Sequence, residues 1–112
     1  MTRVAFRREL SRLNRKQRGT TEAVEAVLDD IAANGLPSTA MQIPGLGGRP
    51  VFKLRIRVGR QGKRACRLIV HYEDGTVEPL FVYAKNDRAN IEPVEIREAL
   101  RAAGLIGESE SN

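Results

Sequence analysis

Residues 51–58 read Val-Phe-Lys-Leu-Arg-Ile-Arg-Val, and the rest of the chain is best interpreted outward from them. Apolar and charged side chains alternate along this stretch, a pattern typical of a β-strand with one buried and one solvent-facing side. Two further strands are expected at about residues 64–72 and 76–84, because Asp74-Gly75 between them is a strong signal for a tight hairpin turn. Pro79 indicates that the last strand is an edge strand or contains a bulge. The sequence therefore predicts an antiparallel sheet of three or four strands.

Helical patterns flank these strands. The spacing of Phe6, Leu10 and Leu13 predicts a first helix, and a second apolar stripe predicts another helix that ends near residue 34. A last helix is expected to start near Pro93, since proline suits the first helical position. Two N-terminal helices, a sheet and one C-terminal helix are typical of an α+β domain. We expect all the helices on one face of the sheet, which would leave the other face open for binding.

The length and composition indicate one small domain. Of the 112 residues, 1–106 are expected to form that domain and 107–112 a polar, disordered tail. Cys66 is the only cysteine, so no internal disulfide forms and a reducing compartment is expected. No apolar run has membrane-spanning length and no signal peptide is apparent, so we expect a cytoplasmic protein without a membrane partner.

The charge is basic and unevenly distributed. Nineteen Lys and Arg face 14 Asp and Glu, a formal net charge of +5. Between Ile31 and Tyr72 there is no acidic residue, while eight Lys or Arg fall there. A basic segment of this kind favours polyanionic partners such as nucleic acid.

The central strand carries the sharpest feature, the cations Lys53, Arg55 and Arg57. A spacing of two residues places all three side chains on one face of the sheet, where they repel one another. Arg67 joins that face, opposite Arg55, if the turn around Gln61 has an odd number of residues. The further cations around this turn are Arg60, Lys63 and Arg64. A merely solvated sheet face would show the same alternation, so a cationic binding patch and a plain surface both remain open at this stage.

Such a patch suits phosphate chemistry. Arginine binds two phosphate oxygens at once, and lysine takes part in proton transfer when like charges crowd it. Cleavage of RNA needs a base for the 2′-hydroxyl, cations for the pentavalent phosphate and an acid for the leaving oxygen. His71 is the only histidine and is expected at the surface or a strand end, so cleavage would have to use Lys, Arg or Tyr side chains.

No metal or other cofactor is expected. The chain has no cluster of His and Cys, and its acids concentrate on helices and turns away from the cationic strand. Gly45-Leu46-Gly47-Gly48 is not followed by the Lys-Ser/Thr of a phosphate-binding loop. Cys66 is expected to be buried as a small apolar side chain. Tyr83, near the end of its strand, is the one aromatic residue expected to stack on a base.

Several segments, taken in order, resemble one family. They are Gly45–Gly48, Lys53–Arg57, Gly62–Arg64, Arg67–Val70 and Phe81–Ile91. Over about residues 4–103, the chain resembles the RelE/HigB-type toxins of type II toxin–antitoxin systems, in the RelE/ParE superfamily. The last segment is the most specific, and it resembles the HigB-like signature that precedes the final helix. The chain departs from the family at Ala65-Cys66, where Gly-Tyr is common, and it has no aromatic residue after Tyr83.

The resemblance implies a RelE-like fold and a metal-independent endoribonuclease. Such an mRNA interferase cleaves mRNA in the ribosomal A site, inhibits translation, and is neutralised by a cognate antitoxin in a hetero-oligomer. Carried onto this chain, the catalytic residues are Lys53, Arg55, Arg67 and Lys85. The residues expected to contact RNA are Arg57, Arg60, Lys63, Arg64, Tyr83 and Asn86.

Two other functions remain open from the sequence. A ParE-like protein of the same fold would bind DNA gyrase and would need no catalytic cations, so the grouping of Lys53, Arg55 and Arg67 counts against it. A non-catalytic RNA- or ribosome-binding module would explain the charge through phosphate contacts alone. Fold does not separate these functions, because function is carried by the site.

Overall fold

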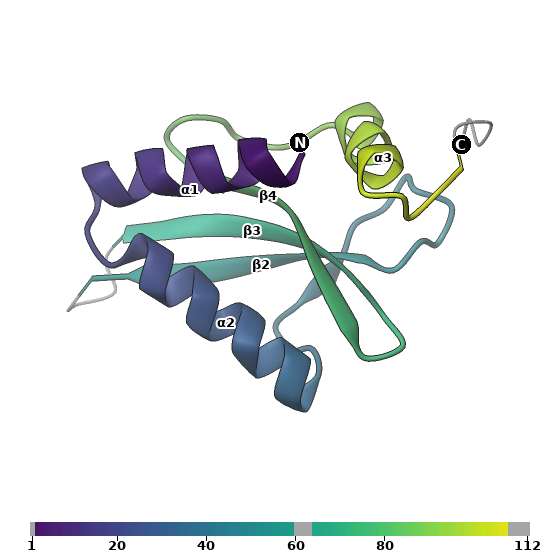
Figure 1. Ribbon diagram of the computed structural model, residues 1–112, viewed down its shortest axis with the longest axis horizontal. Coiled ribbons are helices and arrows are strands. Elements are labelled where there is room, and N and C mark those ends of the chain that lie inside the picture. Colours follow the sequence, from purple (N-terminus) through teal and green to yellow (C-terminus); the bar gives the residue numbers. More distant parts are fainter. Residues whose placement is uncertain (1, 60–63, 108–112) are drawn as a thin grey trace.

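The computed structural model describes residues 2–59 and 64–107, and it confirms the α+β class (Figure 1). In chain order the elements are α1 (Arg3–Lys16), α2 (Thr20–Asn34), β1 (Met41–Gln42), β2 (Val51–Val58), β3 (Arg64–Glu73), β4 (Thr76–Ala84) and α3 (Pro93–Ala102). No helix among the described residues is long and apolar enough to cross a membrane. A polar tail was expected at residues 107–112, and all of it after residue 107 lies outside the described part of the chain.

The four strands form one antiparallel sheet in the order β1-β2-β3-β4. β1 is a two-residue strand that pairs only with Phe52 and Lys53 of β2. The hairpin between β3 and β4 has the expected two-residue turn. Asp74 and Gly75 both have positive φ, 51° and 78°, as the tight turn that matches strand twist requires.

The bulge expected at Pro79 is also present. Ile69 lies opposite Phe81 but Val70 lies opposite Pro79, so Leu80 is the extra residue in β4. Proline has no N–H to donate to the ladder, and a bulge accommodates that loss. The bulge shifts the pairing by one residue and so keeps both Val82 and Leu80 buried, in the two separate apolar clusters of the protein.

The first cluster lies between the sheet and helices α1 and α2. Alternate residues of β2 and β3 point into it, and they meet Phe6, Leu10 and Leu13 of α1 and Val24 and Ile31 of α2. The strand residues in this cluster are Leu54, Ile56, Val58, Cys66, Leu68, Val70 and Val82. α1 lies mainly against β4, and α2 lies against β2 and β4. The buried position of Cys66 agrees with the sequence prediction.

The second cluster shows that one expectation was wrong, because the helices do not share one face of the sheet. Ile96, Ala99 and Leu100 of α3 are buried with Ile69 and Phe81, whose side chains point away from α1 and α2. The loop residue Leu46 is fully buried in the same cluster. An amphipathic helix must cover an apolar surface, and this end of the second face carries one. Only the other end of that face is left for binding.

Polar contacts fix the start of α3. The Glu92 side chain accepts a hydrogen bond from the backbone N–H of Glu95, and the Glu95 side chain accepts one from the N–H of Glu92, which makes a capping box. Ile91 and Ile96, on either side of this box, are buried in the second cluster. The chain between β4 and α3 is therefore held at its far end by both polar and apolar contacts.

Replacing Ile96 by Ala tests whether α3 is part of the folded core. Ile96 is fully buried, so its truncation should lower the free energy of unfolding by about 2–5 kcal/mol. Val94→Ala on the same helix removes a side chain that is 55% exposed, and it should change stability by less than about 0.5 kcal/mol. Urea unfolding monitored by circular dichroism measures both. Equal, small effects of the two variants would show that α3 does not pack on the sheet.

Candidate functional site

The uncovered end of the second sheet face is cationic. Lys53, Arg55 and Arg57 project from β2 on the side opposite α1 and α2, because their neighbours Leu54 and Ile56 are buried on the helix side. Arg55 and Arg67 are direct partners in the ladder between β2 and β3. Their Cβ atoms are therefore expected about 4.5–5.5 Å apart. The predicted register, with Arg67 facing Arg55, is confirmed.

Several arginines elsewhere pair with carboxylates, whereas Lys53, Arg55 and Arg67 of this face do not within the described residues. Arg3 pairs with Glu78 at 2.7 Å, and Arg88 pairs with Glu95 at 2.9 Å. Within the described residues, no ion pair or hydrogen bond involves the side chains of Lys53, Arg55, Arg67 or Lys85. Like charges placed opposite one another do not stabilise a sheet, so folding does not explain this arrangement.

Arg67 and Tyr83 carry buried polar atoms that lack partners. The two residues face each other across β3 and β4. Nη1 of Arg67 and Oη of Tyr83 are both buried, and neither has a hydrogen-bond partner in the described part of the protein. Leaving such a group unsatisfied costs about 1–3 kcal/mol.

The position of Tyr83 corrects its predicted role. Its side chain is only 3% exposed, so the ring offers no open face on which a base could stack. Burial raises the pKa of the Tyr83 hydroxyl, although the positive charges of Arg67 and Arg88 partly oppose that shift. The hydroxyl therefore stays protonated at neutral pH. It can donate a hydrogen bond but does not act as a base.

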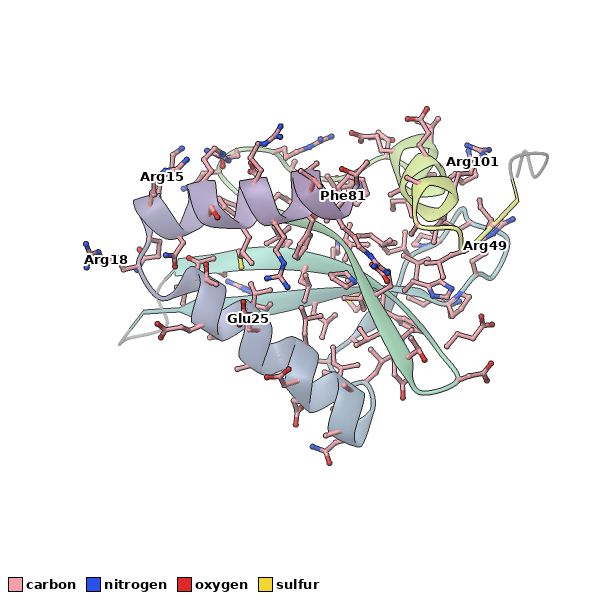
Figure 2. The ribbon with its side chains drawn as sticks, in the orientation of Figure 1. Arg15, Arg18, Glu25, Arg49, Phe81 and Arg101 are labelled. Carbon is pink, nitrogen blue, oxygen red and sulfur yellow. The ribbon has the colours of Figure 1, made fainter. Side chains whose placement is uncertain are left out.

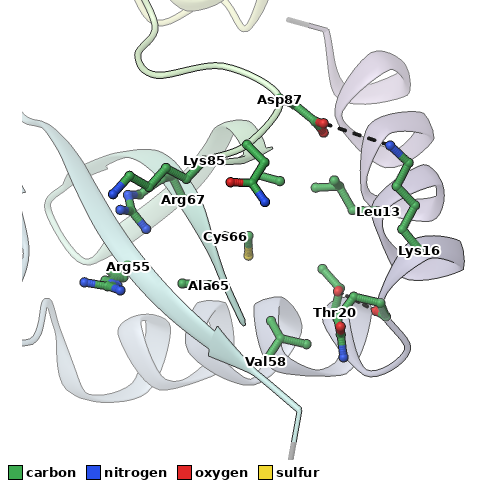
Figure 3. Close-up of a pocket in the computed structure, with 13 residues that line it drawn as sticks. Leu13, Lys16, Thr20, Arg55, Val58, Ala65, Cys66, Arg67, Lys85 and Asp87 are labelled. Atoms are coloured by element: carbon green, nitrogen blue, oxygen red, sulfur yellow. Dashed lines mark hydrogen bonds and ion pairs between the residues drawn. The ribbon is translucent and has the colours of Figure 1, made fainter. Parts of the chain in front are cut away.

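A cavity of about 460 Å³ opens where β4 ends (Figure 3). β4 stops at Ala84, opposite Cys66, whereas β3 continues back to Arg64. The hollow beside this strand end is lined on one side by Arg55, Arg67 and Lys85, and on the other by α1, the start of α2 and the end of β2. The structure thus brings three of the four predicted catalytic residues to one cavity.

Two ion-pair groups hold the segment that carries Lys85. Arg12 Nη2 lies 2.8 Å from Asp87 Oδ2, and Lys16 Nζ lies 3.9 Å from Asp87 Oδ1, which ties the segment to α1. The hydrogen bond from Arg12 lowers the pKa of the Asp87 carboxyl. On the other side, Arg88 binds Glu95 of α3 through two hydrogen bonds. Lys85 therefore sits on a segment that is anchored on both sides.

The remaining predicted residues are placed as follows. Asn86 is exposed and lines the cavity, whereas Lys53 and Arg57 lie on the same sheet face without lining it. Arg60 and Lys63 lie outside the described residues, as does the side chain of Arg64. His71 is on the face of Arg67 but is separated from it by Ile69. Of its two expected positions, the surface is wrong, because the side chain is 8% exposed, whereas the strand end agrees with its place two residues before the end of β3. Arg15 and Arg18, near the end of α1, point outward from the protein (Figure 2).

Sequence reasoning missed the wall of the cavity that α1 provides. Leu13, Lys16 and Gln17 line it because α1 packs along β4 and ends beside the end of that strand. Nothing in the helical pattern states which strand a helix will cover. Asp87 was missed too, although a single acid between Lys85 and Arg88 was a visible signal of an ion pair.

The arrangement suits a phosphate ester. Among the described residues, four cationic side chains line the hollow, namely Arg55, Arg67, Lys85 and Lys16. The one carboxylate there, Asp87, is already paired with Arg12 and Lys16. Arginine side chains fixed on neighbouring strands are preorganised to stabilise charge that develops on phosphoryl oxygens. In the described residues no three His, Cys, Asp or Glu side chains are grouped as a metal site.

Asp87→Asn tests the anchoring of this segment. The backbone N–H groups of Asp87 and Arg88 both donate to Ala84 O, at 3.0 and 3.3 Å, so their hydrogen exchange reports its order. Losing the charge should speed exchange at these two amides, while global stability falls by less than about 1 kcal/mol because the pair is partly exposed. Glu78→Gln, which breaks a distant ion pair with Arg3, should leave both amides unchanged.

The anchoring of this segment should also depend on pH, because it relies on the charge of Asp87. The folded-state pKa of Asp87 is lowered, so the anchor contributes fully above the unfolded value of about 3.9 and is lost as pH falls through the folded one. Acid should therefore loosen the segment in the wild type, and Asp87→Asn should keep only the part of that loosening that comes from protonation of Glu95, the partner of Arg88. If hydrogen exchange at the amides of Asp87 and Arg88 is identical in the wild type and in Asp87→Asn at neutral pH, Asp87 does not anchor this segment.

Comparison with known proteins identifies no family for this chain. Neither a protein-family model nor a curated protein sequence matches the chain. The function is therefore argued from the cationic cavity, its partner-free polar atoms and the resemblance of the segments that build it.

Proposed function

We propose that this protein is a cytoplasmic RelE/HigB-type toxin that cleaves mRNA in the ribosomal A site without a metal. The observation that carries this proposal is the meeting of Arg55, Arg67 and Lys85 in one open cavity, with Nη1 of Arg67 buried and unpartnered. A ribonuclease of this kind needs several cations around one phosphate. The segments that resemble the family supply these three residues.

The reaction assigns a role to each cation. The 2′-oxygen of the message attacks the adjacent phosphorus, and the bond from phosphorus to the 5′-oxygen breaks, which leaves a 2′,3′-cyclic phosphate and a free 5′-hydroxyl. Arg55 and Arg67 stabilise the charge that builds on the phosphoryl oxygens. One proton leaves the 2′-oxygen and one reaches the 5′-oxygen, and Lys85 or Lys53 takes part in these transfers.

Two other side chains near the phosphate are poor candidates for the base. Burial raises the pKa of the Cys66 thiol to about 11, so the thiol is protonated at neutral pH. Tyr83 is protonated for the same reason. Orientation of the message by the ribosome would supply the part of the rate that weak acid–base groups do not.

The proposal includes a protein partner. A cognate antitoxin would neutralise the toxin by offering an acidic segment to the basic field and covering the same surface or displacing α3. A net charge of +5 favours an acidic partner, as does the lack of a carboxylate beside Lys53, Arg55, Arg67 and Lys85 within the described residues. Charges of opposite sign also speed the encounter between two proteins.

Arg67→Ala tests the catalytic assignment. Loss of one preorganised charge stabiliser should slow cleavage by roughly a hundredfold or more. Folding should survive, because Arg67 has no ion-pair or hydrogen-bond partner within the described residues and stands opposite another cation. In vitro translation with primer extension on the message measures the cut sites and their rate of appearance.

Three controls make this measurement decisive. Arg15→Ala removes an exposed arginine that does not line the cavity, and it should cleave like the wild type. EDTA, with magnesium restored to the level that keeps ribosomes intact, should not abolish cleavage. An Arg67→Ala variant as fast as the wild type would overturn the site. Uncut message together with inhibited gyrase supercoiling would replace the proposal with a ParE-like function.

Binding of single-stranded RNA should depend strongly on salt. If about five phosphates are contacted, the logarithm of the affinity should fall with the logarithm of salt concentration at a slope of roughly −3.5. Filter binding at several salt concentrations measures the slope. A slope near zero would mean that the basic face does not bind the RNA backbone.

A further inference from the structure

The positive charge of the protein is concentrated on α1, whose arginines do not line the cavity described above. Residues 3–18 contain seven Arg or Lys and one Glu, a net charge of +6, whereas the whole chain has a net charge of +5. The rest of the chain therefore carries slightly more acid than base. A region with this much positive charge attracts polyanions, and the chemistry proposed above uses none of its arginines.

Ion pairing divides these cations into two groups. The first group pairs with carboxylates that lie outside α1, and it consists of Arg3, Arg7, Arg12 and Lys16. The second group is Arg8, Arg15 and Arg18, which are exposed. Within the described residues, their side chains make no ion pair or hydrogen bond. The charges of the second group therefore do not hold the fold together.

Arg8, Arg15 and Arg18 form what we call the α1 outer surface. The buried stripe of α1 faces the sheet, and with 3.6 residues per turn Arg8 and Arg15 lie on the opposite side of the helix, about 10.5 Å apart along its axis. Arg15 and Arg18 point outward from the protein (Figure 2). The helix dipole favours a cation in the last turn, where Arg15 lies, but it does not stabilise Arg8 in the middle of the helix. Helix stability therefore does not explain this surface.

The composition of the α1 outer surface favours a double-stranded partner. The other residues on this side of the helix, Val4 and Ser11, are exposed and not aromatic, so the bases of a single strand have no ring on which to stack. A duplex keeps its bases inside and presents its phosphates outward, in DNA about one charge per 1.7 Å of helix axis. Each exposed guanidinium can bind two phosphate oxygens, a contact that does not read the sequence.

We propose that the α1 outer surface binds the phosphate backbone of a nucleic-acid duplex. DNA and RNA duplexes share this chemistry. The surface points away from the sheet, whereas Arg55 and Arg67 lie on the sheet face opposite α1, so the duplex and the substrate of the cavity bind at separate places. The inference does not rest on the proposed function, and it adds a second nucleic-acid surface to the protein.

Fluorescence anisotropy with the full chain measures this binding. The probes are a short labelled DNA duplex, an RNA duplex of the same sequence and the corresponding single strand of RNA, each titrated at several salt concentrations. Each phosphate contact adds about 0.9 to the magnitude of the slope of log affinity against log salt. On a duplex, that magnitude should fall by about 0.9 in Arg15→Ala, and by about 2.7 when Arg8→Ala, Arg15→Ala and Arg18→Ala are combined. The duplex that binds more tightly identifies the source of the backbone.

Arg7→Ala is the matched control. It removes an exposed arginine from the same helix and lowers the net charge by the same amount, but Arg7 pairs with Glu25 of α2 at 3.2 Å. The slope should therefore stay as in the wild type. An equal loss of slope in Arg7→Ala and Arg15→Ala would overturn the proposal, because net charge alone would then explain the binding. An unchanged slope in the triple variant, or tighter binding of the single strand than of both duplexes, would overturn it as well.

The outcomes separate this inference from the proposed function. Arg15→Ala should weaken duplex binding and yet cleave mRNA like the wild type, since Arg15 does not line the cavity. Duplex binding that the triple variant weakens, in a protein that does not cleave mRNA, would support the α1 outer surface and contradict the proposed function. Cleavage of mRNA by a protein whose duplex binding does not depend on the arginines of α1 would support the proposed function and overturn this inference.

Discussion

β3 is covered on both faces along only part of its length, and the rest of the structure depends on this constraint. Leu68, Ile69 and Val70 are consecutive and fully buried, so α1 and α2 cover one side of the strand there and α3 covers the other. α3 packs on the second face where Ile69 and Phe81 lie, so it covers one part of that face and leaves the part with Arg55 and Arg67 uncovered.

The uncovered part explains why the cations can stand together. Arg55 is exposed, so solvent screens its repulsion with the half-buried Arg67, but neither cation gains an ion pair from folding within the described residues. The same end of the sheet is where β4 stops and where α1 ends, so the cavity forms beside the cations. The same end of the sheet thus carries both the cations and the cavity.

Much of the sheet could be predicted because its signals are local. The alternation in residues 51–58, the turn at Asp74-Gly75 and the bulge at Pro79 each follow from backbone geometry. The pairing of Arg55 with Arg67 followed from the length of one turn, although that turn lies outside the described residues. Local patterns also predicted the helices, because their apolar stripes repeat within each element.

The features that the sequence did not predict are set by packing between distant segments. The stripe of α3 shows that the helix has a buried side but not which sheet face receives it. Tyr83 follows Val82 in a strand whose two faces are both covered, so alternation did not reveal that its ring is buried. The wall of the cavity depends on where α1 ends relative to β4, and no residue pattern along either element encodes that distance.

The central claim is that Arg55, Arg67 and Lys85 together hold an RNA phosphate, and side-chain NMR tests it most directly. A short single-stranded RNA with 2′-O-methyl groups cannot be cleaved, so it reports binding alone. The account predicts that the guanidinium resonances of Arg55 and Arg67 and the ammonium resonance of Lys85 shift at the lowest RNA concentrations, while those of Arg15 and Arg18 do not. Shifts confined to the arginines of α1, with the cavity residues unchanged, would contradict it.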